Sequence, residues 1–144
     1  MPNAVTGLEI LFELLVQENI GTDPADNKPW PVFVGNQPDT LPQSIALFDI
    51  VMPVEGRIQK TGETIAHEGV QVRVNAKRYD EAREKIKEIQ VLFDAVLKVI
   101  VSVGNDQYEV HCVHQVRTPA YIGQDESDRD SFTLDCSTIC KKVA

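Results

Sequence analysis

The side chains best suited to chemistry in this sequence form a histidine and cysteine group in its last third. His111, Cys112 and His114 lie close together in the chain, and Cys136 and Cys140 follow. Imidazoles and thiolates are ligands that Zn²⁺ prefers, and they could converge if the two segments formed paired strands. The spacing is not that of a zinc knuckle, however, and strand faces seldom supply tetrahedral geometry. We therefore expect no metal site and no cofactor, with a small metal-binding protein as the less favoured alternative.

Other catalytic patterns are weaker still. Cys112 near a histidine suggests a thiol nucleophile, but no oxyanion-hole loop or orienting group accompanies it. An acidic segment resembles a calcium loop only loosely, because it lacks the central glycine and terminal glutamate of an EF-hand. Its acids are Asp125, Glu126, Asp128 and Asp130. Phosphate loops and serine-hydrolase elbows are absent from the sequence, so we expect no enzyme.

Composition indicates one folded domain over residues 1–144, since 144 residues with 42% hydrophobic content can build one core. The chain has 22 acidic and 14 basic residues, a formal net charge of -8. This excess argues against tight binding to nucleic acid, which depends on Lys and Arg. Three cysteines in an apparently reducing context argue against a disulfide framework. The sequence shows no membrane-spanning run and no secretory signal, so we expect no membrane partner and a cytosolic origin.

A first helix is predicted near the amino terminus, where Thr6 and Glu9 have the spacing of a capping box. Gly21 is a plausible stop. Its apolar stripe consists of Ala4, Leu8, Leu11, Phe12 and Leu15. The proline-rich segment 22–42 follows; we expect a short edge strand at 32–34 and an anchoring role for Trp30.

Two strands are predicted at 44–52 and 70–76, and the polar segment between them is long enough to project as an arm. In the second strand, the valines alternate with Gln71, Arg73 and Asn75, which share the opposite face. A helix is then expected to end near Leu97. Its buried face is predicted to contain Tyr79, Ala82, Ile86, Ile89, Phe93 and Val96.

The remaining sequence predicts a hairpin around Gly104, with its second strand at 108–116, and a final strand at 131–140. The segment 123–130 between them reads as a charged, solvated turn. Taken together, these patterns predict an α+β fold, in which two helices pack on a mixed β-sheet and a long β-hairpin arm projects from it.

Two segments in this order, "GVQVRVNAKRYDEAREKIKEI" and "RTPAYIGQDESDRDSFTLDCSTI", resemble the tail-terminator family of long-tailed bacteriophages, also filed as tail-completion or minor capsid proteins. The resemblance covers most of the chain, from the first helix through the last strand. It implies a structural virion protein that forms a ring, typically a hexamer, on the head-proximal end of the tail tube. Such a ring stops tube polymerisation and provides the attachment surface for the head and neck.

The partners implied are further copies of the chain, the tail tube protein and a head–neck connector protein, with DNA passing through the channel without specific binding. Assembly would take place in the host cytoplasm. A different neck component, such as a head-completion or head–tail joining protein, is the nearest alternative. We expect partner contacts from residues in exposed loops. The candidates are Glu55, Arg57, Gln59 and Lys60 in the arm, and Arg117, Asp125, Glu126 and Arg129 near the last strand.

Overall fold

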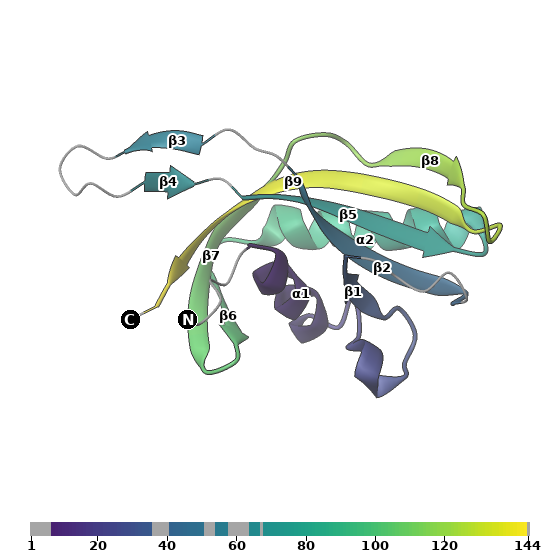
Figure 1. Cartoon of the computed structure of the whole chain (residues 1–144), viewed down its shortest axis with the longest axis horizontal. Coiled ribbons are helices and arrows are strands. Elements are labelled where there is room, and N and C mark those ends of the chain that lie inside the picture. Colours follow the sequence, from purple (N-terminus) through teal and green to yellow (C-terminus); the bar gives the residue numbers. More distant parts are fainter. Residues whose placement is uncertain (1–6, 36–40, 51–53, 58–63, 67, 144) are drawn as a thin grey trace.

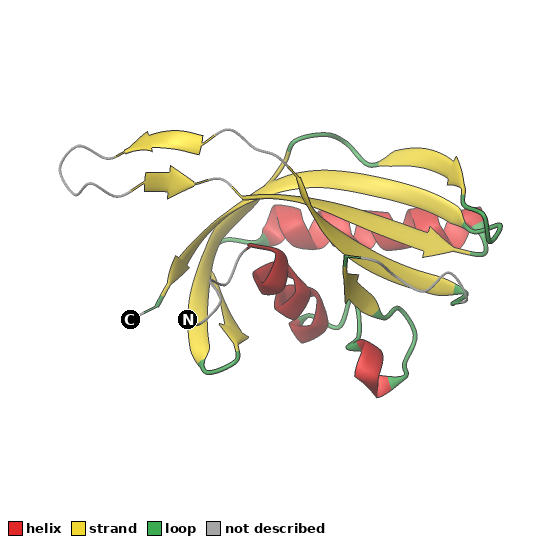
Figure 2. Ribbon diagram, viewed as in Figure 1, coloured by secondary structure: helices red, strands yellow, loops and turns green. Residues whose placement is uncertain are grey.

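The architecture is taken from a computed structural model, which describes residues 7–35, 41–50, 54–57, 64–66 and 68–143. In this part of the chain, two α-helices and a 3₁₀ helix accompany the strands (Figure 2). The helices are α1 (Gly7–Gln17), η1 (Pro24–Asp26) and α2 (Tyr79–Ala95). The strands are β1 (Val32–Val34), β2 (Gln43–Ile50), β3 (Val54–Arg57), β4 (Thr64–Ala66), β5 (Glu68–Ala76), β6 (Val99–Val103), β7 (Asp106–Gln115), β8 (Ala120–Gln124) and β9 (Asp130–Lys142).

The main sheet has seven strands in the order β1-β2-β5-β9-β7-β6, with β8 also paired to β9 (Figure 1). β1 runs parallel to β2, whereas the other pairings are antiparallel. The sheet is therefore mixed. β9 is long enough to pair with β5 along one edge, and with β7 and then β8 along the other.

The buried face of the sheet follows from the alternation of side chains along each strand. The register of β5 on β9 sets Val70 opposite Cys136, and Val72 opposite Leu134. All four side chains are fully buried in one core, together with the inner residues of both α-helices. Both helices thus cover the same face, which we call the inner face. The opposite face, called the outer face, carries the alternate residues of the same strands.

The loop after α1 is held close to the sheet by a glycine and a lysine. A Cβ added to Gly21 would lie 2.2 Å from Cγ2 of Val32, so only glycine fits this approach. From α2, the buried Lys85 donates to the backbone carbonyl of Ile20 at 3.0 Å, and its Nζ lies 4.9 Å from the centre of the Trp30 ring. Trp30 packs against the core, in agreement with its predicted anchoring role.

Strands β3 and β4 form a separate two-stranded sheet, which extends away from the main sheet at one end (Figure 1). The predicted α+β fold, with two helices on a mixed sheet and a hairpin arm, is confirmed. No helix in the described part of the chain is long and apolar enough to cross a membrane.

Several details differ from the prediction. Strand β8 was not predicted, and Tyr79 was wrongly assigned to the buried face of α2: its side chain is 48% exposed and stacks on Tyr121 and Phe132. Helix α1 ends before Gly21, and α2 ends at Ala95 because Val96 is extended. The predicted positions of Ala4 and Thr6 in the first helix, and of Val51 and Met52 in a strand, lie outside the described residues.

Candidate interaction surface

The histidine and cysteine group is divided between the two faces of the sheet. Strand β7 does pair with β9, but the register sets Cys112 opposite Ile139 and His114 opposite Ser137. These positions lie on the outer face, whereas Cys136 points into the core. The convergence of these histidine and cysteine side chains on one metal ion, considered from the sequence, is therefore wrong. Among the described residues, which include all five members of this group, no cluster of three metal-binding side chains occurs.

Cys136 has a structural environment. Its side chain is fully buried, and its Sγ donates to the backbone carbonyl of Val70 at 3.3 Å. Burial, with a smaller contribution from the negative charge of Asp135, raises the pKa of the thiol to about 12. The neutral form is therefore dominant at physiological pH, and this environment disfavours a nucleophilic thiolate.

The acidic turn between β8 and β9 is ordered by its own side chains. The carboxylate of Asp125 accepts backbone N–H bonds from Ser127 and Arg129, both at 2.9 Å. Its other oxygen lies 2.8 Å from Nε and 2.7 Å from Nη2 of Arg129. Arg129 also donates from Nη1 to the backbone carbonyl of Leu41 at 3.2 Å, which ties the turn to the start of β2. The turn is therefore held by the ion pair between Asp125 and Arg129 and by the two backbone N–H groups whose hydrogen bonds Asp125 accepts.

The electrostatics of this ion pair follow from its burial. Burial alone would raise the pKa of Asp125. The hydrogen bonds and positive charge of Arg129, together with the N–H of Ser127, lower this pKa by more than burial raises it, so the pKa lies below its ordinary value. The Arg129 side chain is only 3% exposed. Arg129 was chosen as a contact candidate because a loop position was expected to be exposed, and that expectation is wrong. Its role in this turn is to hold Asp125.

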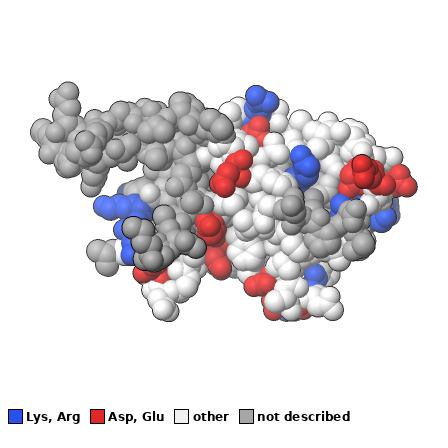
Figure 3. Space-filling view, in the orientation of Figure 1, with Lys and Arg blue, Asp and Glu red and all other residues white. Residues whose placement is uncertain are grey.

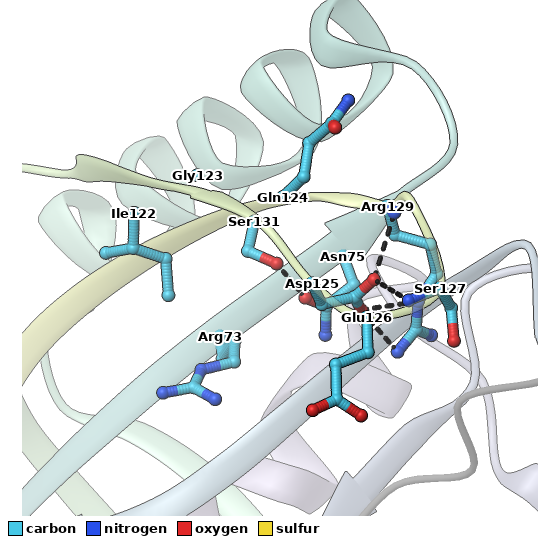
Figure 4. Close-up of a pocket in the computed structure, with 10 residues that line it drawn as sticks. All are labelled: Arg73, Asn75, Ile122, Gly123, Gln124, Asp125, Glu126, Ser127, Arg129 and Ser131. Carbon is cyan, nitrogen blue, oxygen red and sulfur yellow. Dashed lines mark hydrogen bonds and ion pairs between the residues drawn. The ribbon is translucent and has the colours of Figure 1, made fainter.

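An open hollow of about 300 Å³ lies beside this turn on the outer face (Figure 4). Its lining comes from strand β5, from the second half of β8, from the turn itself and from the start of β9. Three of the candidate residues, Asp125, Glu126 and Arg129, take part, and Arg117 does not. The lining residues are Arg73, Asn75, Ile122, Gly123, Gln124, Asp125, Glu126, Ser127, Arg129 and Ser131.

The other candidates lie elsewhere. Arg117 follows β7, and its side chain is 79% exposed, with Nε 3.9 Å from a carboxylate oxygen of Asp135. Glu55 and Arg57 belong to strand β3 of the arm, for which the structure describes the backbone only. Gln59 and Lys60 lie outside the described residues. The candidates therefore lie in three places: the arm, the β8–β9 turn and, for Arg117 alone, the end of β7 beside Asp135.

Sequence reasoning missed the β5 side of the hollow. Arg73 and Asn75 were assigned to the polar face of their strand, as observed, but they were not considered as part of a site. Asn75 is 1% exposed, and the guanidinium carbon of Arg73 lies 5.4 Å from the centre of the Phe48 ring. The available signal was Asn75, because asparagine is depleted in β-strands and needs a specific reason to stand in one.

Comparison with protein families identifies the chain. A family model described as bacteriophage tail terminator protein matches residues 14–141. The chain belongs to this family. The match begins within the last turn of α1 and runs through α2 and the β8–β9 turn to the penultimate residue of β9. No curated protein matches the sequence.

Membership of a tail-terminator family makes the chain a structural component of a bacteriophage tail, which assembles with other tail components in the virion. The family is structural and not enzymatic. In the view of Figure 3, acidic and basic side chains are scattered over a largely uncharged surface, and neither sign forms a continuous patch.

Proposed function

We propose that copies of this chain form a hexameric ring on the head-proximal end of the tail tube, where the ring stops tube polymerisation and presents a surface to the head–neck connector protein. DNA passes through the ring without specific binding, consistent with the excess of 22 acidic over 14 basic residues. The subunits assemble in the host cytoplasm. Family membership supports the terminator role, and the arm supports the ring.

The observation that carries the ring is the separate β3–β4 hairpin. Among the residues that the structure describes, it pairs with no strand of the main sheet, and it extends away from that sheet (Figure 1). A two-stranded hairpin is at best marginally stable in water unless its faces or edges pack on something else. A neighbouring subunit is the nearest surface that an outward arm meets in a ring. One patch on each copy then contacts a different patch on the next, as a closed heterologous ring requires.

The terminator role is tested by electron microscopy of lysates from the parent phage with this gene disrupted. Overlong tails of variable length, detached from filled heads, are the expected result. Tails of normal length beside unattached heads would instead identify a neck component of another kind. Intact infectious virions would overturn both functions.

The arm is tested in the same system by supplying a variant in which its four candidate residues are alanine. These are Glu55, Arg57, Gln59 and Lys60. If the arm makes the ring contact, the variant fails to restore tails of uniform length, although its circular dichroism spectrum matches the wild type. Uniform tails capped by this variant would remove these side chains from the mechanism.

A further inference from the structure

An arginine with no ion-pair partner in the described part of the chain lies on the outer face. Arg73 projects from the middle of β5, and its guanidinium packs over the Phe48 ring, 5.4 Å from the ring centre. Its Nε is buried and has no hydrogen-bond partner. A buried donor without an acceptor is unfavourable, and more so when the group is charged. The described part of one subunit therefore does not supply an acceptor for the Nε–H group of Arg73.

A second donor lies two residues along the same strand. Asn75 is 1% exposed, and its Oδ1 accepts a hydrogen bond from the Ser131 hydroxyl. This bond fixes the orientation of the amide, and Nδ2 is buried without a partner. Both donors belong to residues that line the hollow shown in Figure 4. The β5 wall of the hollow therefore carries the positive charge of Arg73, and two N–H donors without a partner among the described residues belong to its side chains.

The opposite wall leaves room for a ligand. Gly123 has a φ of +99°, and a Cβ built there would meet nothing within 4 Å, so the hollow is open on this side. Of the two acids in the lining, Asp125 is already neutralised by Arg129. The exposed Glu126 is the remaining negative group, and it would oppose an incoming anion.

We propose that this hollow binds a carboxylate, supplied in the assembled ring by an aspartate or glutamate side chain of a neighbouring copy of this chain. The Arg73 guanidinium matches a carboxylate in geometry and charge, and Asn75 lies two residues along the same strand as a second reporter of the hollow. The chain is suited to supply the ligand, because it carries 22 acidic residues against 14 basic ones. The assignment to a neighbouring copy rests on the proposed ring; the carboxylate site does not.

The site is tested by ¹⁵N NMR of the full chain, which observes the arginine Nε–H and asparagine Nδ2–H₂ groups directly. The probe is N-acetyl-glutamate methylamide, and the matched neutral control is N-acetyl-glutamine methylamide. The signals of Arg73 and Asn75 should shift saturably with the charged probe only. Equal shifts with both probes, or no saturable shift, would overturn the site.

Three variants test which side chains determine the affinity for the charged probe. Arg73→Gln should weaken binding of the charged probe by roughly tenfold or more, as expected for loss of a charge-assisted hydrogen bond. Arg83→Gln, an identical change at an exposed position of α2, should leave the affinity unchanged. Glu126→Gln should tighten binding, because it removes the opposing charge from the lining. Equal affinity for the Arg73 and Arg83 variants would contradict the assignment.

The source of the carboxylate is tested separately, by adding unlabelled chain to ¹⁵N-labelled chain. A neighbouring copy should move the same two signals in the same direction as the charged probe. If the probe binds but added chain leaves both signals unmoved up to millimolar concentration, the carboxylate belongs to another molecule and that assignment is wrong. Failure of the proposed function has a different signature, namely normal tails in the gene-disrupted phage.

Discussion

The ion pair in the β8–β9 turn leads to a quantitative prediction for the substitution Asp125→Ala. The substitution removes a carboxylate that contacts two nitrogens of Arg129, a side chain that is 3% exposed, and that also caps two backbone N–H groups. Removing one partner of a buried ion pair typically costs 3–5 kcal/mol. The Asp125 side chain is itself 27% exposed, so water can partly replace it. We expect a loss near the lower limit, about 3 kcal/mol of the free energy of unfolding.

The chain provides a matched control for this loss. Asp80 forms a 3.0 Å ion pair with Arg78 at the start of α2, and these side chains are 59% and 69% exposed. Exposed pairs contribute little, so Asp80→Ala should cost about 1 kcal/mol or less. Both variants are measured by urea unfolding, followed by far-UV circular dichroism. Equal losses for the two substitutions would refute the argument that burial of Arg129 sets the strength of the turn.

The same turn predicts a dependence on pH. Because the pKa of Asp125 is lowered in the folded state, its contribution is fully present above the ordinary value of 3.8 and is lost as the pH falls through the folded pKa. The wild type should therefore lose more stability than Asp125→Ala as the pH is lowered below about 4. Parallel stability profiles for the two proteins over this acidic range would show that the carboxylate does not carry the effect.

Three further perturbations address the packing of the fold. Gly21→Ala should destabilise the chain by about 1–3 kcal/mol in urea unfolding, because its Cβ would lie 2.2 Å from Val32; unchanged stability would show that the loop can move away. Lys85→Ala should expose the Trp30 ring, because it removes the side chain whose Nζ lies 4.9 Å from the ring centre, and should shift the tryptophan fluorescence to longer wavelength; an unchanged emission maximum would contradict this. Cys136, with a pKa of about 12, should react with iodoacetamide at pH 8 only on unfolding, and rapid labelling of the folded chain at this position would disprove its burial.

The elements that sequence patterns predicted are those whose residues repeat on one period. The alternating valines of β5 and the helical spacing in α2 each define a buried face without reference to the rest of the chain. The length of the polar segment after β2 likewise indicated the arm. Tyr79 fits the helical period but lies at the first turn of α2, where it packs against Tyr121 of β8 and Phe132 of β9 at the margin of the core and stays 48% exposed.

Strand β8 could not be predicted in this way. Its five residues lie between Pro119 and an acidic turn, Gly123 interrupts them, and its side chains are mostly exposed. The strand exists because β9 extends beyond the end of β7 and offers its edge there. The hollow depends on the same long-range pairing, since one wall comes from β5 and the other from β8 and the turn. Sequence placed Arg73 on the polar face, but its packing on the Phe48 ring follows only from the pairing of β5 with β2.

The central position of β9 has a consequence for synthesis. β9 follows β5, β7 and β8 in the chain, yet it is the strand to which all three are paired. While the ribosome translates the chain, these earlier strands emerge first, and their edges stay open until β9 leaves the exit tunnel. Open edges favour pairing between different chains. Each nascent chain therefore has open strand edges until β9 has been synthesised and has paired. During this interval it is exposed to misassembly with other chains, before it joins a tail.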